Sequence, residues 1–147
     1  MYQKRRTSLV RFKDMYNQED IRCLLIATYY SDEEAKNFFL ERLNDRDLLD
    51  VLIKVALDEG DYNGDGPMAA GDYIHKFSSK WLKEYEEILL TILYRENYSS
   101  VRPEDIAMAL ASFKSPKAKS FILDNINELG EGPRFESFKE ALRKYEA

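Results

Sequence analysis

The apolar residues of this chain recur at steps of three and four positions, and the strict alternation that is typical of β-strands is absent. Such spacing places side chains on one face of a helix. Only ten residues are glycine or proline, and they gather at 60–71, 103, 116 and 130–133, between the periodic segments. The pattern predicts one all-α domain over residues 1–147, with about seven or eight helices.

Caps and helix breakers around the periodic segments predict where each helix begins and ends. Ser31 opens a Ser-Asp-Glu-Glu sequence that is typical of a capping box, and Pro67 stands where a proline can open a helix. Gly60 and Gly130 are the expected stops of two helices. The predicted elements are an extension or short helix in 1–18, helices over about 20–30, 32–44, 45–59, 67–77, 79–93, 103–113 and 116–129, and a capping helix in 133–147.

Three phenylalanines indicate a longer period. Phe39, Phe77 and Phe113 each end the apolar stripe of the first helix in a pair, at separations of 38 and 36 residues. A period in the high thirties is typical of two-helix repeats. The segment from Pro103 to Leu123, with an alanine-rich first helix, a Ser-Pro turn and an aliphatic second helix, resembles a HEAT-type repeat. The resemblance implies an α-solenoid of antiparallel helix pairs over 32–129, and such repeats are mostly interaction scaffolds without chemistry of their own.

Composition excludes several classes of protein. The 147 residues include 22 basic and 27 acidic side chains, one Cys and one His. A single cysteine cannot form an internal disulfide, and it does not supply a cysteine-rich zinc module. No apolar stretch has the length of a signal-peptide core or a membrane span, so we expect a cytoplasmic protein without a membrane partner. The net charge of −5 argues against a nucleic-acid partner.

The negative charge is concentrated in one segment. Residues 1–30 carry a net charge of +3, residues 76–147 are neutral, and residues 31–75 hold four basic and twelve acidic side chains, a net of −8. One interpretation is a solvated acidic face that keeps the protein soluble. The other is a surface that attracts a cation or a basic protein. The residues expected to form that partner-binding surface are Asp58, Glu59, Asp61, Tyr62, Asp65 and Asp72.

The sequence from Asp61 to Gly66, Asp-Tyr-Asn-Gly-Asp-Gly, is followed by Asp72 at the twelfth position. It resembles the calcium loop of EF-hands and dockerins. The resemblance implies Ca²⁺ binding by the side chains of Asp61, Asn63, Asp65 and Asp72 and by the carbonyl of Pro67. The alternative is a tight turn between two helices, because these residue types are also the ones that turns require. We therefore expect no cofactor, with calcium as the alternative.

Residues able to carry out catalysis are few. Cys23 lies in an apolar stretch where cysteine is usually inert, and His75 follows Asp72 by one helical turn. No phosphate-binding loop, nucleophile elbow or zinc-spaced cluster is present in the sequence, so we expect no enzyme. Contact residues are better represented, since Tyr62, Tyr94 and Tyr98 fall outside the apolar stripes and exposed tyrosines make good contact surfaces. The basic start, Lys4-Arg5-Arg6, is a minor candidate for contact with RNA or a membrane.

The function predicted from these features is non-catalytic binding of another protein. A small, acidic, helical domain of this kind resembles the immunity proteins of bacterial toxin systems. That resemblance implies a basic, nuclease-like toxin domain as partner, blocked sterically when Asp61, Asp65 and Asp72 pair with its Lys or Arg side chains. The alternatives are a calcium-binding module that uses loop 61–72, and a helical scaffold or adaptor with a different protein partner.

Overall fold

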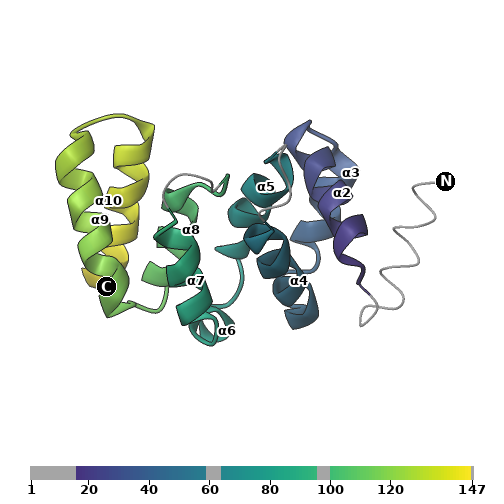
Figure 1. The fold of residues 1–147 in the computed structure, drawn as a ribbon, viewed down its shortest axis with the longest axis horizontal. Coiled ribbons are helices and arrows are strands. Elements are labelled where there is room, and N and C mark those ends of the chain that lie inside the picture. The colour runs from purple at the N-terminus through teal and green to yellow at the C-terminus, as the bar shows by residue number, and fades with distance from the viewer. Residues whose placement is uncertain (1–15, 59–63, 96–99, 147) are drawn as a thin grey trace.

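The computed structural model describes residues 16–58, 64–95 and 100–146, and all regular structure within these ranges is helical (Figure 1). The all-α prediction is therefore confirmed. None of the described helices combines the length and the apolar character that crossing a bilayer requires. The described ranges hold α2 (Gln18–Tyr29), α3 (Glu33–Leu40), α4 (Arg46–Leu57), α5 (Asp65–Ile74), α6 (Ser79–Lys83), α7 (Glu86–Leu93), α8 (Pro103–Ala111), α9 (Pro116–Leu129) and α10 (Pro133–Glu146).

The helices pack in two layers. Helix α2 contacts α5, α5 contacts α8, and α8 contacts α10, which makes one continuous layer. The second layer is formed by α4 against α5, α7 against α8, and α9 against α8 and α10. Figure 1 shows the helices side by side along the long axis, from α2 and α3 at one end to α9 and α10 at the other. This stacking is compatible with helix pairs, and the HEAT-type repeat stays a prediction.

The core runs through both layers and is richest at α4. That helix buries seven of its twelve residues, and α3 adds Phe39, whose ring centroid lies 5.0 Å from that of Tyr73 on α5. Full burial of each leucine or phenylalanine side chain is worth about 1.5–3 kcal/mol. Helix α8 contributes small residues, since Ala107, Ala109 and Ala111 are all fully buried, and neighbouring helices can therefore approach it closely. Its position in the middle of the layer depends on that close approach.

Two predicted helix boundaries in the first half of the chain are wrong. The cap of α3 is Asp32, whose carboxylate accepts a hydrogen bond from the backbone N–H of Ala35 at 3.0 Å, and Ser31 instead takes a left-handed φ of 69°. Helix α3 ends at Leu40 and not near residue 44, because the N–H groups of Glu41 and Arg42 bond back to Asn37 and Phe39 and close the turn. The sequence offers Asp45 or Asp47 as the cap of the next helix, and the cap is Asp45, whose Oδ1 accepts a hydrogen bond from the backbone N–H of Asp47 at 3.0 Å.

Helix α5 begins earlier than predicted, at Asp65 and not at Pro67. Gly64 caps it with a φ of 80°, and its carbonyl accepts a hydrogen bond from the N–H of Met68 at 3.1 Å. A Cβ at Gly64 would lie 2.5 Å from Oγ of Ser100, so both the conformation and the available space require glycine. Pro67 lies in the first turn, where its missing N–H needs no partner.

The single helix predicted over 79–93 is divided into α6 and α7. The break lies at Glu84 and Tyr85, whose backbone N–H groups bond three residues back to Trp81 and Leu82. Tyr85 extends toward α4, where its hydroxyl donates to Asp50 Oδ1 at 3.3 Å. The turn therefore directs an aromatic side chain toward the other layer. Residues 1–15 of the extension or short helix predicted over 1–18 lie outside the described residues.

Candidate functional site

Three of the six residues predicted to form the acidic surface lie in the part of the chain that the structure describes. Asp58 is the C-cap of α4, Asp65 is the first residue of α5, and Asp72 lies two turns further along α5. Seven residues of helix correspond to a rise of about 10.5 Å. Asp65 and Asp72 therefore do not converge on one ion as the calcium-loop resemblance implies, and Pro67 lies inside the helix. Glu59, Asp61, Tyr62 and Asn63 lie outside the described residues.

Two carboxylates of segment 31–75 lie at opposite ends of α2. At the N-terminal end, Asp45 Oδ2 accepts a hydrogen bond from the hydroxyl of Tyr16 at 2.8 Å. At the C-terminal end, Asp65 Oδ2 accepts one from the hydroxyl of Tyr30 at 3.2 Å. A helix of twelve residues separates these two sites by about 18 Å. The net charge of the segment is thus spread over the molecule, and Asp65 belongs to a smaller surface at one end.

That smaller surface, here called the Tyr–Asp surface, consists of Tyr29, Tyr30 and Asp65. The two rings pack edge to face with centroids 5.2 Å apart, and Tyr30 is 69% exposed while Tyr29 is 47% exposed. The hydrogen bond to Asp65 raises the pKa of the Tyr30 hydroxyl, which therefore stays a neutral donor. The turn after α2 adds Asp32 and Glu33 at the start of α3.

Sequence reasoning missed Tyr29 and Tyr30. The available signal was their position, because both lie outside the stripe of Ile21, Leu24 and Leu25 and immediately before the predicted cap of the next helix. The predicted contact residue Tyr94 is 51% exposed, but its hydroxyl bonds to the carbonyl of Lys117 and its ring packs against Phe121 on α9. Tyr62 and Tyr98 lie outside the described residues.

A second cluster lies where α5 meets α8. Asp72 lies in the last turn of α5, His75 is the C-cap of that helix, and Asp105 lies in the first turn of α8. One potential ligand atom from each of the three side chains lies within 4.8 Å of the others, and all three residues are half-buried. His75 Nε2 is 3.9 Å from Asp72 Oδ1, and Lys76 Nζ is also 3.9 Å from that oxygen. This arrangement brings two carboxylates and an imidazole together from different helices.

The two carboxylates of this cluster have opposite electrostatic environments. The imidazole of His75 and the ammonium of Lys76 hold the pKa of Asp72 below its usual value. Burial raises the pKa of Asp105, and the nearby carboxylate of Asp72 raises it further. Within the described residues, Oδ2 of Asp105 is buried without a hydrogen-bond partner. A buried acceptor of this kind costs about 1–3 kcal/mol unless something compensates it.

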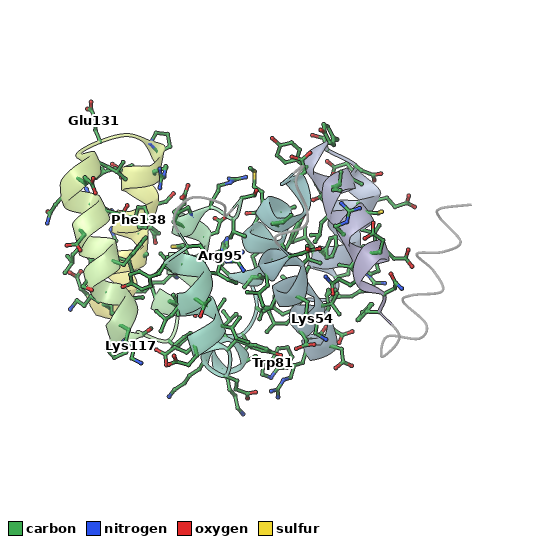
Figure 2. The ribbon with its side chains drawn as sticks, in the orientation of Figure 1. Lys54, Trp81, Arg95, Lys117, Glu131 and Phe138 are labelled. Atoms are coloured by element: carbon green, nitrogen blue, oxygen red, sulfur yellow. The ribbon has the colours of Figure 1, made fainter. Side chains whose placement is uncertain are left out.

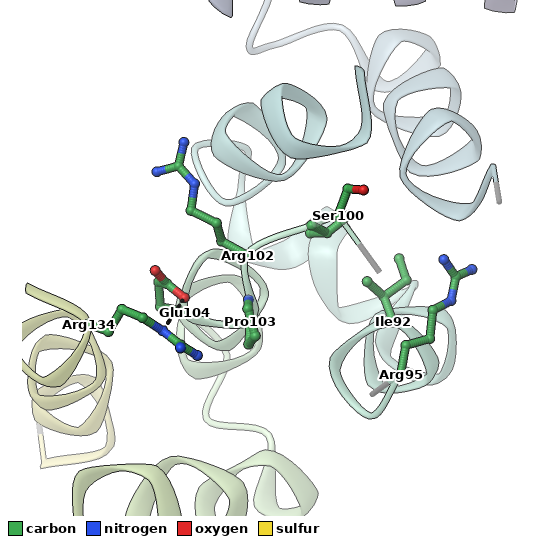
Figure 3. Close-up of a pocket in the computed structure, with 8 residues that line it drawn as sticks. Ile92, Arg95, Ser100, Arg102, Pro103, Glu104 and Arg134 are labelled. Carbon is green, nitrogen blue, oxygen red and sulfur yellow. Dashed lines mark ion pairs between the residues drawn. The ribbon is translucent and has the colours of Figure 1, made fainter. Parts of the chain in front are cut away.

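A cavity of about 410 Å³ opens beside the N-terminus of α8 (Figure 3). Arg95, Arg102 and Arg134 line it together with Glu104, Pro103, Val101, Ser100 and Ile92. Arg134 Nε lies 3.4 Å from Oε1 of Glu104, and Arg95 donates to the carbonyl of Leu57 at 3.1 Å. Two of the three guanidinium groups therefore have acceptors within the chain itself, and the cavity is a weaker candidate for a binding site than the two clusters.

Comparison with known proteins adds no function. No protein-family model, curated protein or solved structure matches this chain. The function therefore has to be inferred from the two clusters, one at the exposed end of α2 and one between α5 and α8.

Proposed function

We propose that this protein binds and blocks a basic protein domain through the Tyr–Asp surface, as a non-catalytic inhibitor of the immunity type. The observation that carries the proposal is a pair of exposed tyrosines that pack on each other beside a carboxylate. Tyrosine is enriched at the centre of protein interfaces and loses little conformational entropy when it is buried there.

The packing of the two rings supports the proposal further. Tyr30 contacts the ring of Tyr29 and the carboxylate of Asp65, so its position is largely set before a partner arrives. A contact group that is already ordered costs less free energy to fix on binding. Tyr94 has similar support from Phe121 and the carbonyl of Lys117, but only one ring is exposed there, whereas Tyr29 and Tyr30 expose two adjacent rings.

Charge supports a basic partner. Asp65 lies in the Tyr–Asp surface, and Asp32 and Glu33 lie in the adjoining turn. Complementary charge at an interface accelerates association and selects the partner. The inhibition would be steric, because this protein would cover the active-site cleft of its partner. The proposal assigns no catalytic role to Cys23 or His75. A scaffold that uses the same surface is the alternative.

The experiment is a capture from native cells with the tagged protein, in which the wash is done at low and at high salt. A partner that is released at high salt is then purified, and its hydrolysis of nucleic acid is measured with and without the protein. We expect the complex to lose this activity. We expect Asp65→Lys to slow association by at least about tenfold, and Tyr30→Ala to accelerate dissociation.

The matched control is Asp124→Lys, which makes the same charge change on an exposed position of α9, at the far end of the molecule. It should leave the association rate within about twofold of the wild type. Equal slowing by Asp65→Lys and Asp124→Lys would show that net charge and not this surface governs binding. A partner that stays fully active when it is saturated with the protein would favour the scaffold.

A further inference from the structure

We propose that Asp72, His75 and Asp105 form a binding site for a divalent transition-metal ion, with Zn²⁺ as the best fit. The site lies between α5 and α8, and its donors are two carboxylate oxygens and one imidazole nitrogen. The inference is independent of the Tyr–Asp surface and of any partner protein.

The backbone of α5 is built to bring these donors together. Asp72 and His75 are three residues apart, so they lie on the same face of the helix. Gly71 lies on the side of α5 that faces α8. A Cβ at this position would lie 2.8 Å from Cγ1 of Val101 and 3.8 Å from Oδ2 of Asp105. The absence of a side chain at this position lets α5 approach the first turn of α8, and Asp105 reaches the other two donors as a result.

The separations fit a single ion. In a tetrahedral site, two ligands bonded at about 2.0–2.2 Å lie about 3.3–3.6 Å from each other. His75 Nε2 and Asp72 Oδ1 are 3.9 Å apart, and all three donors lie within 4.8 Å of one another. Side-chain rotations that shorten these separations by about 0.5–1.5 Å would bring the three donors around one ion. A fourth position would remain for water, as in zinc sites with three protein ligands.

The donor types select the metal. An imidazole with two carboxylates suits zinc and its neighbours, whereas calcium and magnesium prefer sites made of oxygen alone. The second observation that points to a cation is Oδ2 of Asp105, a buried carboxylate oxygen without a hydrogen-bond partner in the described parts of the chain. A bound cation would compensate that oxygen directly. Without a cation, the positive groups that act on Asp105 are the imidazolium of His75 and the guanidinium of Arg102.

The test uses the full chain after treatment with a chelator. Zn²⁺, and separately Ca²⁺, is titrated into the protein by calorimetry, and Co²⁺ is added to report the coordination sphere by its visible absorption. We expect one equivalent of Zn²⁺ to bind, with no comparable binding of Ca²⁺. Asp105→Asn and His75→Gln should each weaken Zn²⁺ binding at least tenfold, and His75→Gln should also shift the Co²⁺ spectrum. Two variants are used so that a folding defect in one leaves the other as the test.

The matched control is Asp124→Asn, the same chemical change on the exposed face of α9, which should bind Zn²⁺ as the wild type does. Circular dichroism checks that each variant keeps the helical content of the wild type. The proposal is overturned if Zn²⁺ does not bind at millimolar concentration, since the cluster would then be an internal network of ion pairs. It is equally overturned if both variants bind like the wild type, or if Ca²⁺ binds more tightly than Zn²⁺.

Discussion

Helices α4 and α9 are similar in length but differ in what they bury. Helix α4 buries seven of twelve residues, including Leu49, Leu52 and Val55, whereas α9 buries only Ala118 and Ile122 among fourteen. Both have the apolar spacing of an amphipathic helix, so periodicity alone does not distinguish them. The difference is position in the stack. Helix α4 packs on α2 and α5, while α9 packs on α8 and α10 at the end of the molecule, where Glu131 projects from their connecting turn (Figure 2).

The comparison indicates that stability is concentrated around α4 and that the terminal pair α9–α10 contributes less. The most sensitive test of this difference in stability is to make the same truncation in both helices. Leu52→Ala removes a fully buried side chain from α4 and should lower the free energy of unfolding by about 2–5 kcal/mol. Leu123→Ala removes a side chain that is 39% exposed on α9 and should change it by about 0.5 kcal/mol or less.

Urea denaturation monitored by circular dichroism measures both variants under the same conditions. Because each change replaces leucine with alanine inside a helix, helix propensity affects the two variants almost equally. Similar losses in both would show that α9 carries as much of the fold as α4 does.

A second test sharpens the comparison at the contact between α5 and α8, which joins the two ends of the stack. Gly71→Ala places a Cβ 2.8 Å from Cγ1 of buried Val101, and we expect destabilisation by about 1–3 kcal/mol. In a Val101→Ala background the same change should become neutral or stabilising by up to about 1 kcal/mol, because alanine is a better helix former than glycine. A double-mutant cycle by urea denaturation measures this coupling. The absence of coupling would mean that Val101 does not limit the space for a side chain at position 71.

The smallest expected effect concerns the attachment of α10. The hydroxyl of Tyr145 donates to the carbonyl of Ser115 at 2.7 Å, at the start of α9. Tyr145→Phe should cost about 0.5–1.5 kcal/mol at neutral pH. Burial, with a smaller effect of Glu86, raises the pKa of Tyr145 to about 12. The folded state thus holds this proton more tightly than the unfolded chain, in which the pKa is about 10.

The stabilisation associated with this proton is present below pH 10 and is lost as the pH rises from about 10 to about 12. The difference in unfolding free energy between wild type and Tyr145→Phe should therefore shrink over that interval, measured by urea denaturation at successive pH values. Tyr29→Phe serves as a control at an exposed tyrosine. A difference that stays constant from pH 9 to about 12 would contradict the assignment.

Much of the helical order was predictable because its signals are local. Pro103, Pro116 and Gly130 mark helix ends that depend only on neighbouring residues, and the structure places α8 and α9 within these limits. The division of α6 from α7 was not predictable in this way. Tyr85 leaves the helical path toward Asp50, a residue 35 positions away, and no window of ten or fifteen residues contains both.

The candidate sites show the same limit. The Asp72–His75 spacing is visible in the sequence, but Asp105 joins them from 30 residues further along through the contact of α5 with α8. The acidic segment was visible as composition, yet two of its carboxylates, Asp45 and Asp65, lie at opposite ends of α2. Net charge per segment does not contain that geometry. Tyr30 becomes a candidate binding residue only because the fold places Asp65, 35 residues further along the chain, beside it.

The place of α8 in the stack has a consequence for how the molecule opens. Its nine residues are too few to form a stable helix alone in water. Yet α8 contacts α5, α6 and α7 on one side and α9 and α10 on the other. Partial unfolding of the α9–α10 end leaves the contacts of α8 with α5, α6 and α7 in place, and α8 itself is released only when both sides separate. A segment that is too short to form a helix by itself is thus fully released only when the helices on both sides of it are lost.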